Sequence, residues 1–383
     1  MSRQIDQVDV VIVGGGIVGL AHALAAAKRG LKVVVFERNL QAVGASIRNF
    51  GMIWPIGQPA GPLRERAMKS RQIWLAVSQK AGFAAEQTGS LHLAYQEDEM
   101  AVLEEFVATV GDQLGTVELL TPDRVPDKSP AVNPDGLLGA LWSSTEVIVD
   151  PREAIAKIPG LLQTEYGVEF QFGTVVSEID PPQIVTTQGT WRAEQVFICS
   201  GVDFQTLYPE HYASSGLTKV KLQMMRTIPQ PDQFRIGAAL CAGLTLTHYS
   251  AFAHCQTLGA LKDRIQAETP WFPHWGIHVM ASQNASGELI LGDSHEYGLN
   301  PDPFDRAEIN RYILDYLEGF LRVPALEIAE TWHGVYAKLP GSTEFVQQIE
   351  PGITVVNGLS GAGMTLSFGL AEEVLTSQGI AAC

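Results

Sequence analysis

The sequence has few cysteines and little positive charge. Its four cysteines show no CxxC spacing, and so long a chain with so few of them does not suggest a disulfide framework; we interpret them as reduced thiols. With 26 Lys and Arg against 42 Asp and Glu, the formal net charge is −16. A general attraction to nucleic acid or to an anionic membrane is therefore not expected, and any anionic ligand needs a local site.

Long apolar runs, internal repeats and low-complexity segments are also missing. The only candidate for a membrane span or a signal segment is 8–27, but Asp9 and the run of glycines at 14–16 interrupt it, and no basic segment precedes it. We therefore expect a soluble, cytoplasmic protein. At 383 residues with 46% hydrophobic content, the chain should fold into two interleaved lobes.

Both ends of the chain are typical of a nucleotide-binding sheet. A β-branched run at 8–13 predicts a strand, 17–30 predicts an Ala-rich helix, and 32–37 predicts a second buried strand. Near the C-terminus, a strand at 353–356 precedes a glycine-rich turn and a helix. We expect one parallel sheet to which both termini contribute.

The middle of the chain mixes helices with strands. Helices are expected at 63–82, 97–115 and 304–321, and a buried strand at 195–199. From 222 to 292 the pattern predicts alternating strands rich in His, Tyr and Trp. In that region His274 and His278 have the spacing of a helical metal site, but no metalloprotease glutamate accompanies them and the neighbouring residues favour a strand, so no metal is expected.

The glycine turn after the first strand has the spacing of a dinucleotide-binding motif. Gly14, Gly16 and Gly19 form GxGxxG between strand and helix, and Glu37 ends the next strand. Such glycines let backbone N–H groups approach a pyrophosphate, while the acid can accept from a ribose hydroxyl. The motif predicts a bound dinucleotide without distinguishing FAD from NAD.

The choice between FAD and NAD follows from the resemblance of two further motifs to a known family. The segments GASIRNFGM (44–52) and GLSGAGMTLS (358–367) resemble the D-amino-acid oxidase, glycine oxidase and sarcosine oxidase family of flavoenzymes, as do VIVDPREAI, VFICSG and GELILGD between them. The resemblance implies FAD and an α/β fold with an inserted α+β lobe. A Rossmann-like FAD-binding domain (1–88, 142–205 and 325–383) would be interleaved with an antiparallel-sheet substrate domain (89–141 and 206–324).

The resemblance also implies which residues meet the cofactor. Members with covalent flavin use a cysteine or histidine, and the late cysteine is absent here because Cys383 is the last residue, so noncovalent FAD is expected. The expected cofactor residues are Gly14, Gly16, Ile17, Val18, Gly19, Glu37, Arg38, Ala45, Ser46, Arg48, Asn49, Val175, Ser200, Gly201, Gly361, Ala362, Gly363, Met364 and Thr365.

The substrate end departs from the family. Where its amino-acid oxidases show an arginine and a proline that clamp a carboxylate, this chain has Tyr336 and Ala337, with Lys338 two residues after Tyr336. An ammonium suits a tetrahedral anion about as well as a carboxylate, whereas arginine favours the planar one. Lys338 could instead be a solvated surface lysine. The expected substrate-binding residues are Tyr336, Lys338, Arg48, Asn49, Tyr249 and His278.

The segments GASIRNFGMIWPIGQP and WHGVYAK resemble a bacterial branch of the family linked with aminophosphonate breakdown. The resemblance implies that hydride transfer to flavin N5 oxidises an amine such as 2-aminoethylphosphonate or its N-methyl derivative to an imine, which then hydrolyses. Dioxygen is favoured as the electron acceptor over a quinone or a protein. A glycine- or sarcosine-type oxidase or dehydrogenase and a redox-silent flavin-binding subunit of a complex are the alternatives. The oligomeric state stays open.

Overall fold

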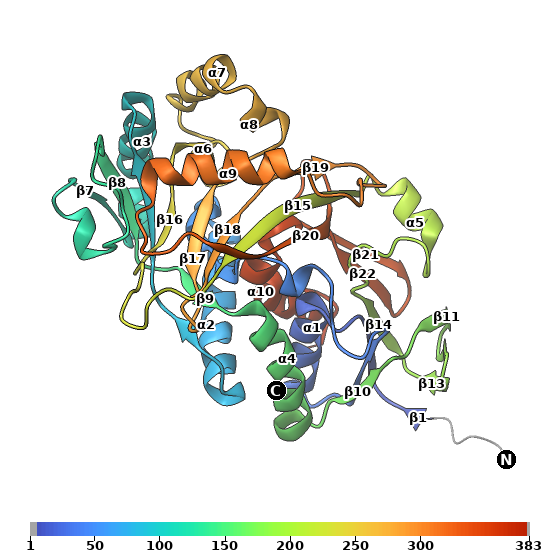
Figure 1. Cartoon of the computed structure of the whole chain (residues 1–383). Coiled ribbons are helices and arrows are strands. Elements are labelled where there is room, and N and C mark those ends of the chain that lie inside the picture. Colours follow the sequence, from blue (N-terminus) through green and yellow to red (C-terminus); the bar gives the residue numbers. More distant parts are fainter. Residues whose placement is uncertain (1–5, 381–383) are drawn as a thin grey trace.

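The computed structural model describes residues 6–380, and two large sheets organise them (Figure 1). The first sheet has six strands in the order β10-β3-β2-β14-β22-β21. All neighbours in it are parallel except β21, which runs antiparallel to β22. Its strands are β2 (Val10–Val13), β3 (Val33–Glu37), β10 (Glu169–Phe172), β14 (Gln195–Ile198), β21 (Phe345–Glu350) and β22 (Ile353–Asn357).

Alternate residues of these strands pack into two cores. Val10 and Ile12 face helices α1, α2, α4 and α10, while Val11 faces a small sheet of β1, β11, β12 and β13 on the other side. Because both faces are covered, the strands are apolar runs and not alternating ones. The covering elements are α1 (Ile17–Ala27), α2 (Pro62–Ala81), α4 (Pro151–Tyr166), α10 (Gly363–Ser377), β1 (Asp6–Gln7), β11 (Val176–Asp180), β12 (Gln183–Thr186) and β13 (Gly189–Arg192).

The second sheet has nine strands in the order β19-β15-β18-β17-β16-β6-β8-β7, with β20 paired to β15. Its pairs are antiparallel except β16 with β6. The strands are β6 (Ser90–Ala94), β7 (Val117–Leu120), β8 (Gly139–Ser143), β15 (Thr218–Thr227), β16 (Ala239–Cys241), β17 (Met280–Gln283), β18 (Leu289–Gly292), β19 (Glu296–Tyr297) and β20 (Ile328–Lys338).

A third, three-stranded sheet and several helices complete the described chain. The sheet is β4 (Met52–Ile53), β9 (Val147–Val149) and β5 (Ala85–Glu86). The remaining helices are α3 (Glu97–Leu114), α5 (Pro209–Ser214), α6 (Gly243–Leu246), α7 (Leu258–Glu268), α8 (Trp271–His274) and α9 (Ala307–Phe320). Short 3₁₀ turns are η1 (Ala45–Ile47), η2 (Pro55–Gly57), η3 (Val125–Asp127), η4 (Ser250–Phe252) and η5 (Ser360–Ala362).

The predicted fold class and the long elements are confirmed, but the prediction of alternating strands throughout 222–292 is wrong. Helices α6, α7 and α8 lie between β16 and β17, and His274 belongs to α8. Leu258, Leu261 and Ile265 of α7 are buried in the core of the second sheet, at the spacing of one helix face. That spacing was the sequence signal for α7.

Strand β20 links the two sheets. It pairs with β15 over its whole length, and Lys338 then forms an isolated bridge with Leu359, next to the first sheet. A domain boundary at 325 would therefore separate β20 from the sheet with which it pairs, and the division into two domains stays a prediction. Among residues 6–380, no helix is long and apolar enough to cross a bilayer.

Candidate functional site

A cleft of about 960 Å³ opens at the carboxyl ends of the parallel strands β2, β14 and β22 and continues under the second sheet. This edge is where open α/β sheets bind ligands. Apart from Gly19, every predicted cofactor and substrate residue lines the cleft. Predicted site residues that are far apart in the sequence, from 14 to 365, thus line one cleft.

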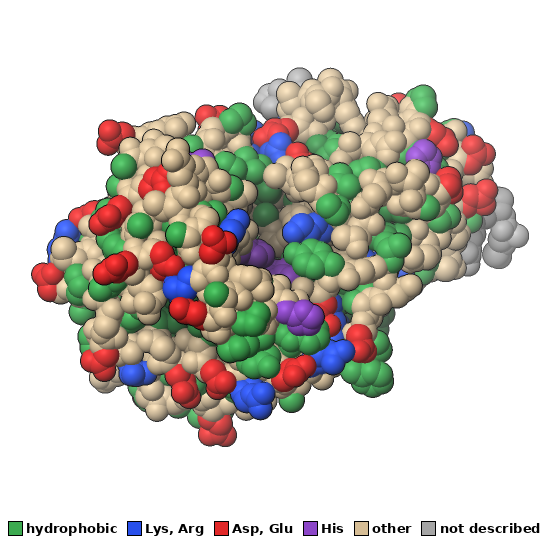
Figure 2. Space-filling view, turned by 90° about the horizontal axis from the view of Figure 1, so that it is seen from above, with side chains coloured by type: hydrophobic (Ala, Val, Ile, Leu, Met, Phe, Trp, Pro, Cys, Tyr) green, Lys and Arg blue, Asp and Glu red, His purple; other side chains and the backbone are tan. Residues whose placement is uncertain are grey.

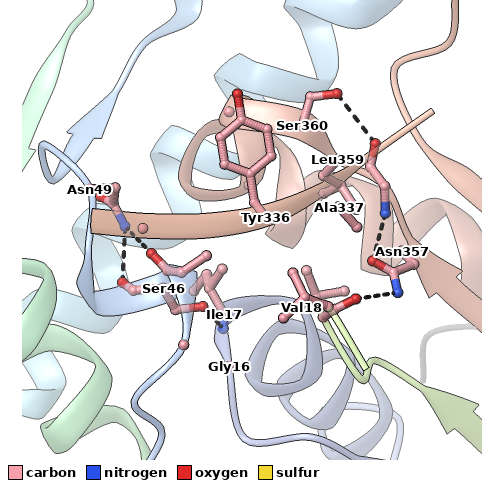
Figure 3. A pocket seen from close by; sticks show the side chains of 18 of the residues that line it. Gly16, Ile17, Val18, Ser46, Asn49, Tyr336, Ala337, Asn357, Leu359 and Ser360 are labelled. Carbon is pink, nitrogen blue, oxygen red and sulfur yellow. Dashed lines mark hydrogen bonds between the residues drawn. The ribbon is translucent and has the colours of Figure 1, made fainter. Parts of the chain in front are cut away.

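The glycine turn leaves no room for side chains. Gly14 has φ +108°, and a Cβ there would lie 2.4 Å from the carbonyl oxygen of Cys199. A Cβ on Gly16 would lie 3.0 Å from Ser46 Oγ, which accepts a 2.9 Å hydrogen bond from Ile17 N (Figure 3). Gly19 acts differently, because its Cβ would lie 1.9 Å from the oxygen of Gly14. Gly19 lets the helix pack against the turn, while Gly14 and Gly16 border the cleft.

Glu37 is buried at the end of β3, and its carboxylate is held by the backbone. Oε2 accepts from Gly15 N at 2.9 Å, and Oε1 accepts from Asn39 N at 3.0 Å and from Asn39 Nδ2 at 3.1 Å. The carboxylate is thereby oriented toward the glycine turn, where it can also accept from a ribose hydroxyl.

Four further predicted cofactor residues, Arg38, Val175, Ser200 and Gly201, line the same cleft. Arg38 forms an ion pair with Asp203, and Val175 N donates to Thr187 Oγ1 at 3.1 Å. Ser200 donates to the oxygen of Asp203 at 2.9 Å, and the oxygen of Gly201 accepts from Asn357 at 2.8 Å. These contacts hold the walls of the cleft in place.

The N-terminus of α10 opens onto the opposite wall. The turn η5 carries Gly361 and Ala362 directly into the helix, whose first residues are Gly363, Met364 and Thr365. Thr365 Oγ1 accepts from Trp54 N at 2.9 Å, which ties the helix start to the segment after 44–52. The partial positive charge at this end favours an anionic group in the cleft.

The loop at 45–49 is fixed to its surroundings by hydrogen bonds. Asn49 Nδ2 donates to the oxygens of Ala45 and Ser46, each at 3.0 Å, and Asn49 Oδ1 accepts from Gly51 N at 2.8 Å (Figure 3). Arg48 donates to the oxygen of His333 at 3.2 Å. Because these bonds engage the Asn49 amide, Asn49 positions the loop.

Tyr336 and Lys338 lie in the cleft from the same side of β20, as the strand alternation predicts. Lys338 Nζ lies 3.4 Å from Tyr297 Oη and 5.1 Å from the centre of that ring. Burial, reinforced by the charge of Asp293, raises the pKa of the Tyr336 and Tyr249 phenols well above their ordinary value. Both are therefore neutral donors at physiological pH.

The structure adds His248 and Asp293, which the sequence did not single out, to the lining of the cleft beside His278. The sequence placed His295 and Tyr297 in the lobe that should cover the flavin without fixing their direction; His295 lines the cleft and Tyr297 contacts Lys338. A concentration of His and Tyr in this stretch was the available signal, but it did not separate inward from outward residues. His254, for example, packs on Phe106 outside the cleft.

The cysteines within 6–380 are buried and free: Cys199, Cys241 and Cys255. Cys199 lines the cleft beside Gly14, and burial raises the pKa of its thiol. The expectation that Cys383 does not attach the flavin concerns a residue outside the described ones. The backbone cradle at Gly14 and Gly16, the oriented Glu37 and the start of α10 fit FAD along the cleft.

Comparisons with known proteins show the family of this chain. The DAO family model, described as FAD-dependent oxidoreductase, matches residues 9–376. Glycine oxidase of Geobacillus kaustophilus is 27% identical over 345 residues, covering 85% of this chain and 80% of that protein. Glycerol 3-phosphate dehydrogenase of Caloramator mitchellensis is 26% identical over 312 residues, covering 79% and 57%.

A third relative is matched over a shorter segment. One subunit of the anaerobic glycerol-3-phosphate dehydrogenase of Escherichia coli K12 is 30% identical over 140 residues, which cover 37% of this chain and only 26% of that protein. The match thus spans about a quarter of the relative's length.

Solved structures share the fold. Glycine oxidase of G. kaustophilus superposes with a TM-score of 0.76 at 22% identity, covering 97% of this chain and 95% of that one. The FAD-bound L-α-glycerophosphate oxidase of Mycoplasma pneumoniae gives 0.73 at 17% identity, covering 97% and 95%. Because the family model spans nearly the whole chain, the protein belongs to the DAO family of FAD-dependent oxidoreductases, and its cofactor is FAD.

Proposed function

We propose that this FAD-dependent oxidoreductase oxidises a small amine that carries an acidic group, and that the preferred acid is a phosphonate, as in 2-aminoethylphosphonate or its N-methyl derivative. The observation that carries the proposal is the place of Lys338. Its ammonium extends from β20 into the cleft beside Tyr297 and Tyr336. Such a point charge with freely rotating donors suits a tetrahedral anion.

The arginines of the cleft support this assignment. Within 6–380, those that line it are Arg38 and Arg48; the first pairs with Asp203 and the second donates to the backbone of His333. A two-point arginine clamp for a carboxylate is therefore not formed by these side chains as they lie. Lys338 is left as the cation for the acidic group.

The relatives are named for two kinds of substrate, and the proposed substrate shares one chemical group with each kind. Glycine oxidase is named for an amino acid, and the glycerol 3-phosphate dehydrogenases for a phosphate monoester. An aminophosphonate has the amine of the first and the tetrahedral acid of the second. We infer that this chain uses the shared fold for a substrate of mixed type.

Bound FAD supplies the hydride acceptor, so the chain must bind the substrate, orient it and keep its amine neutral. Lys338 and Tyr336 would hold the acidic end and thereby place the C–H bond next to the amine at the flavin. Tyr249 and Tyr336 are neutral and largely enclosed, and such a desolvated wall lowers the pKa of a bound amine. No strong acid or base is required of the protein.

The same site could serve a glycine- or sarcosine-type substrate, and the glycine oxidase match favours that second candidate. We propose that the FAD is bound noncovalently and that dioxygen is the electron acceptor. A redox-silent subunit would bind FAD without reacting with any amine.

A panel of amines, amino acids and aminophosphonates, mixed anaerobically with the purified holoenzyme, tests the proposal. We expect 2-aminoethylphosphonate or its N-methyl derivative to bleach the flavin faster than glycine or sarcosine. Faster bleaching by the amino acids would establish the second candidate. No bleaching by any amine would favour the redox-silent protein, and hydrogen peroxide released in air would identify an oxidase.

A further inference from the structure

Three histidines from separate segments stack on one another inside the cleft. His248 follows α6, His278 precedes β17 and His295 lies between β18 and β19. The ring centres of His248 and His278 are 3.8 Å apart, and those of His278 and His295 are 5.3 Å apart. Figure 2 shows a hollow in the surface with histidine side chains inside it. We call these three residues the histidine stack.

The hydrogen bonds of the histidine stack indicate which ring nitrogens carry a proton and which carry a lone pair. His295 Nδ1 donates to the oxygen of Gly276 at 2.9 Å, so in a neutral ring the lone pair is on Nε2. His278 Nε2 lies 3.0 Å from Asp293 Oδ1, and His278 Nδ1 is buried without a hydrogen-bond partner among the described residues. The stack therefore has basic nitrogens that the protein does not satisfy.

A metal ion is one ligand to consider, since a nitrogen from each of the three rings lies within 4.8 Å of the others. However, the His278 ring is inclined to the other two by only 25° and 19°, and the His248 and His295 rings are inclined to each other by 37°. Rings inclined so little direct their in-plane lone pairs along similar lines, whereas metal ligands must converge on one point. The ammonium of Lys338 on the same side of the cleft also opposes a cation there.

An anion fits the same groups better. His248 is exposed to the open cleft, where desolvation by the surrounding walls, the neighbouring imidazoles and the Lys338 ammonium lower its pKa well below the ordinary value. Burial also lowers the pKa of His295, against an opposing contribution from Asp293. The groups that face the stack are Asp293, Lys338, Tyr249, Tyr297 and Tyr336. A negative charge among them would oppose the repulsion from Lys338 that, together with desolvation, lowers the pKa of His248 and His295.

We propose that the histidine stack and Lys338 form one proton-linked binding site for a tetrahedral dianion, either a phosphonate or a phosphate monoester. Binding brings a proton onto the stack, so that the dianion meets an imidazolium as well as an ammonium. A carboxylate, with a single charge, draws the proton less strongly and binds less tightly. This inference rests on the proposed function, because it identifies how the acidic end of the substrate is recognised.

Calorimetric titration of the holoenzyme tests whether ligand binding is accompanied by proton uptake. Methylphosphonate, glycerol phosphate and acetate would each be titrated at a pH of about 8, above the second pKa of about 6 of phosphate monoesters. Repeating each titration in buffers of different ionisation enthalpy counts the protons. We expect uptake of about one proton with either dianion and close to none with acetate. Binding of only one dianion would identify its source as phosphonate or as phosphate ester.

Substitutions test whether His248 is needed for the proton uptake. His248→Gln should weaken methylphosphonate binding by about 10-fold or more and abolish most of the uptake, since a charge-assisted contact is lost. His254→Gln, at an exposed histidine that packs on Phe106 outside the cleft, is the matched control and should change neither. Unchanged FAD content in both variants shows that they fold.

Several results would overturn the proposal. These are dianion binding without proton uptake, acetate binding as tight as methylphosphonate, and tight Zn²⁺ binding lost in His248→Gln, which would make the stack a metal site. The proposed function fails separately: if aminophosphonates do not bleach the flavin but methylphosphonate binds with a proton, the dianion site stands and the assigned reaction is wrong.

Discussion

Lys338 illustrates how one side chain can set the substrate class. Its ammonium lies over the Tyr297 ring, and its charge acts on the His248 and His295 imidazoles. Lysine is costly to enclose without an anionic partner. A substrate anion would supply that partner, which is why this residue carries the proposed function.

Lys338→Met should reduce kcat/KM for the best amine by about 10- to 200-fold, mainly through KM, because a charge-assisted contact to the acidic group is lost. The flavin spectrum should hardly change. Steady-state kinetics with the substrate found by the panel provides the measurement. Lys338→Arg should shift the preference toward a carboxylate analogue, which the planar guanidinium fits better.

Lys219→Met is the control for this prediction. Lys219 lies opposite Ala337 across the β15–β20 pair, but its ammonium packs over the Phe204 ring and it does not line the cleft. An unchanged KM in Lys338→Met, or an equal loss in Lys219→Met, would show that Lys338 is an ordinary surface lysine.

At the scale of elements, the turn between β2 and α1 combines two kinds of glycine. Gly14 and Gly16 keep the cleft open at the helix start, whereas Gly19 allows the helix to approach the turn. The two roles predict different defects. A side chain at Gly16 should affect the cofactor first, and one at Gly19 should affect the packing of the fold.

Gly16→Val should abolish or strongly reduce FAD binding, because its side chain would meet Ser46 Oγ and extend into the pyrophosphate space. Flavin absorbance per mole of purified protein measures the effect. Gly160→Val in α4 is the control, since a Cβ there meets nothing within 4 Å. Full flavin content in Gly16→Val would mean that the nucleotide binds elsewhere.

At the scale of the whole molecule, the way FAD is retained can be tested directly. Heat or acid should release intact FAD into the supernatant, because we propose that the glycine turn, Glu37 and the start of α10 hold it without a covalent bond. Chromatography of the supernatant identifies the released flavin. A coloured precipitate with a clear supernatant would instead point to a covalent bond, for which the histidine stack supplies candidate residues.

Stability should depend on pH through buried histidines. His92 on β6 is fully buried against Trp54 and Phe252, has no hydrogen-bond partner on either ring nitrogen among the described residues, and burial lowers its pKa from 6.5 to about 3. His22 in α1 is buried likewise, with a pKa of about 4. Both rings stay neutral in the folded protein where the unfolded chain takes up protons.

These lowered pKa values determine the direction in which the free energy of unfolding changes with pH. As pH falls below 6.5, the unfolded state binds protons that the folded state refuses, so the free energy of unfolding decreases by about 1.4 kcal/mol per pH unit for each such histidine. His92→Phe should remove the contribution of one histidine, about 1.4 kcal/mol per pH unit, from the slope of the free energy of unfolding between about pH 6 and 4.5. Denaturant unfolding of the holoenzyme at several pH values measures it, with His274→Phe at an exposed position as control. Equal slopes for His92→Phe and the unchanged protein would contradict the prediction.

The amino-acid sequence by itself determined the features whose signals are local. The β-branched run of β2, the glycines that follow it and the acid that ends β3 lie within thirty residues of one another. Their spacing predicts strand, turn and helix because backbone conformation there is set by neighbours along the chain. The same holds for α3 and α9, whose periodic apolar faces are read directly.

Only the tertiary structure decided how the substrate end is built. His248, His278, Asp293 and His295 come together because β17 and β18 pair antiparallel and α6 ends beside them. Lys338 meets them because β20 pairs with β15 in one particular register, and a shift by one residue would turn its side chain to the other face. Contacts between such distant segments depend on packing across the whole sheet, which no short stretch of sequence encodes.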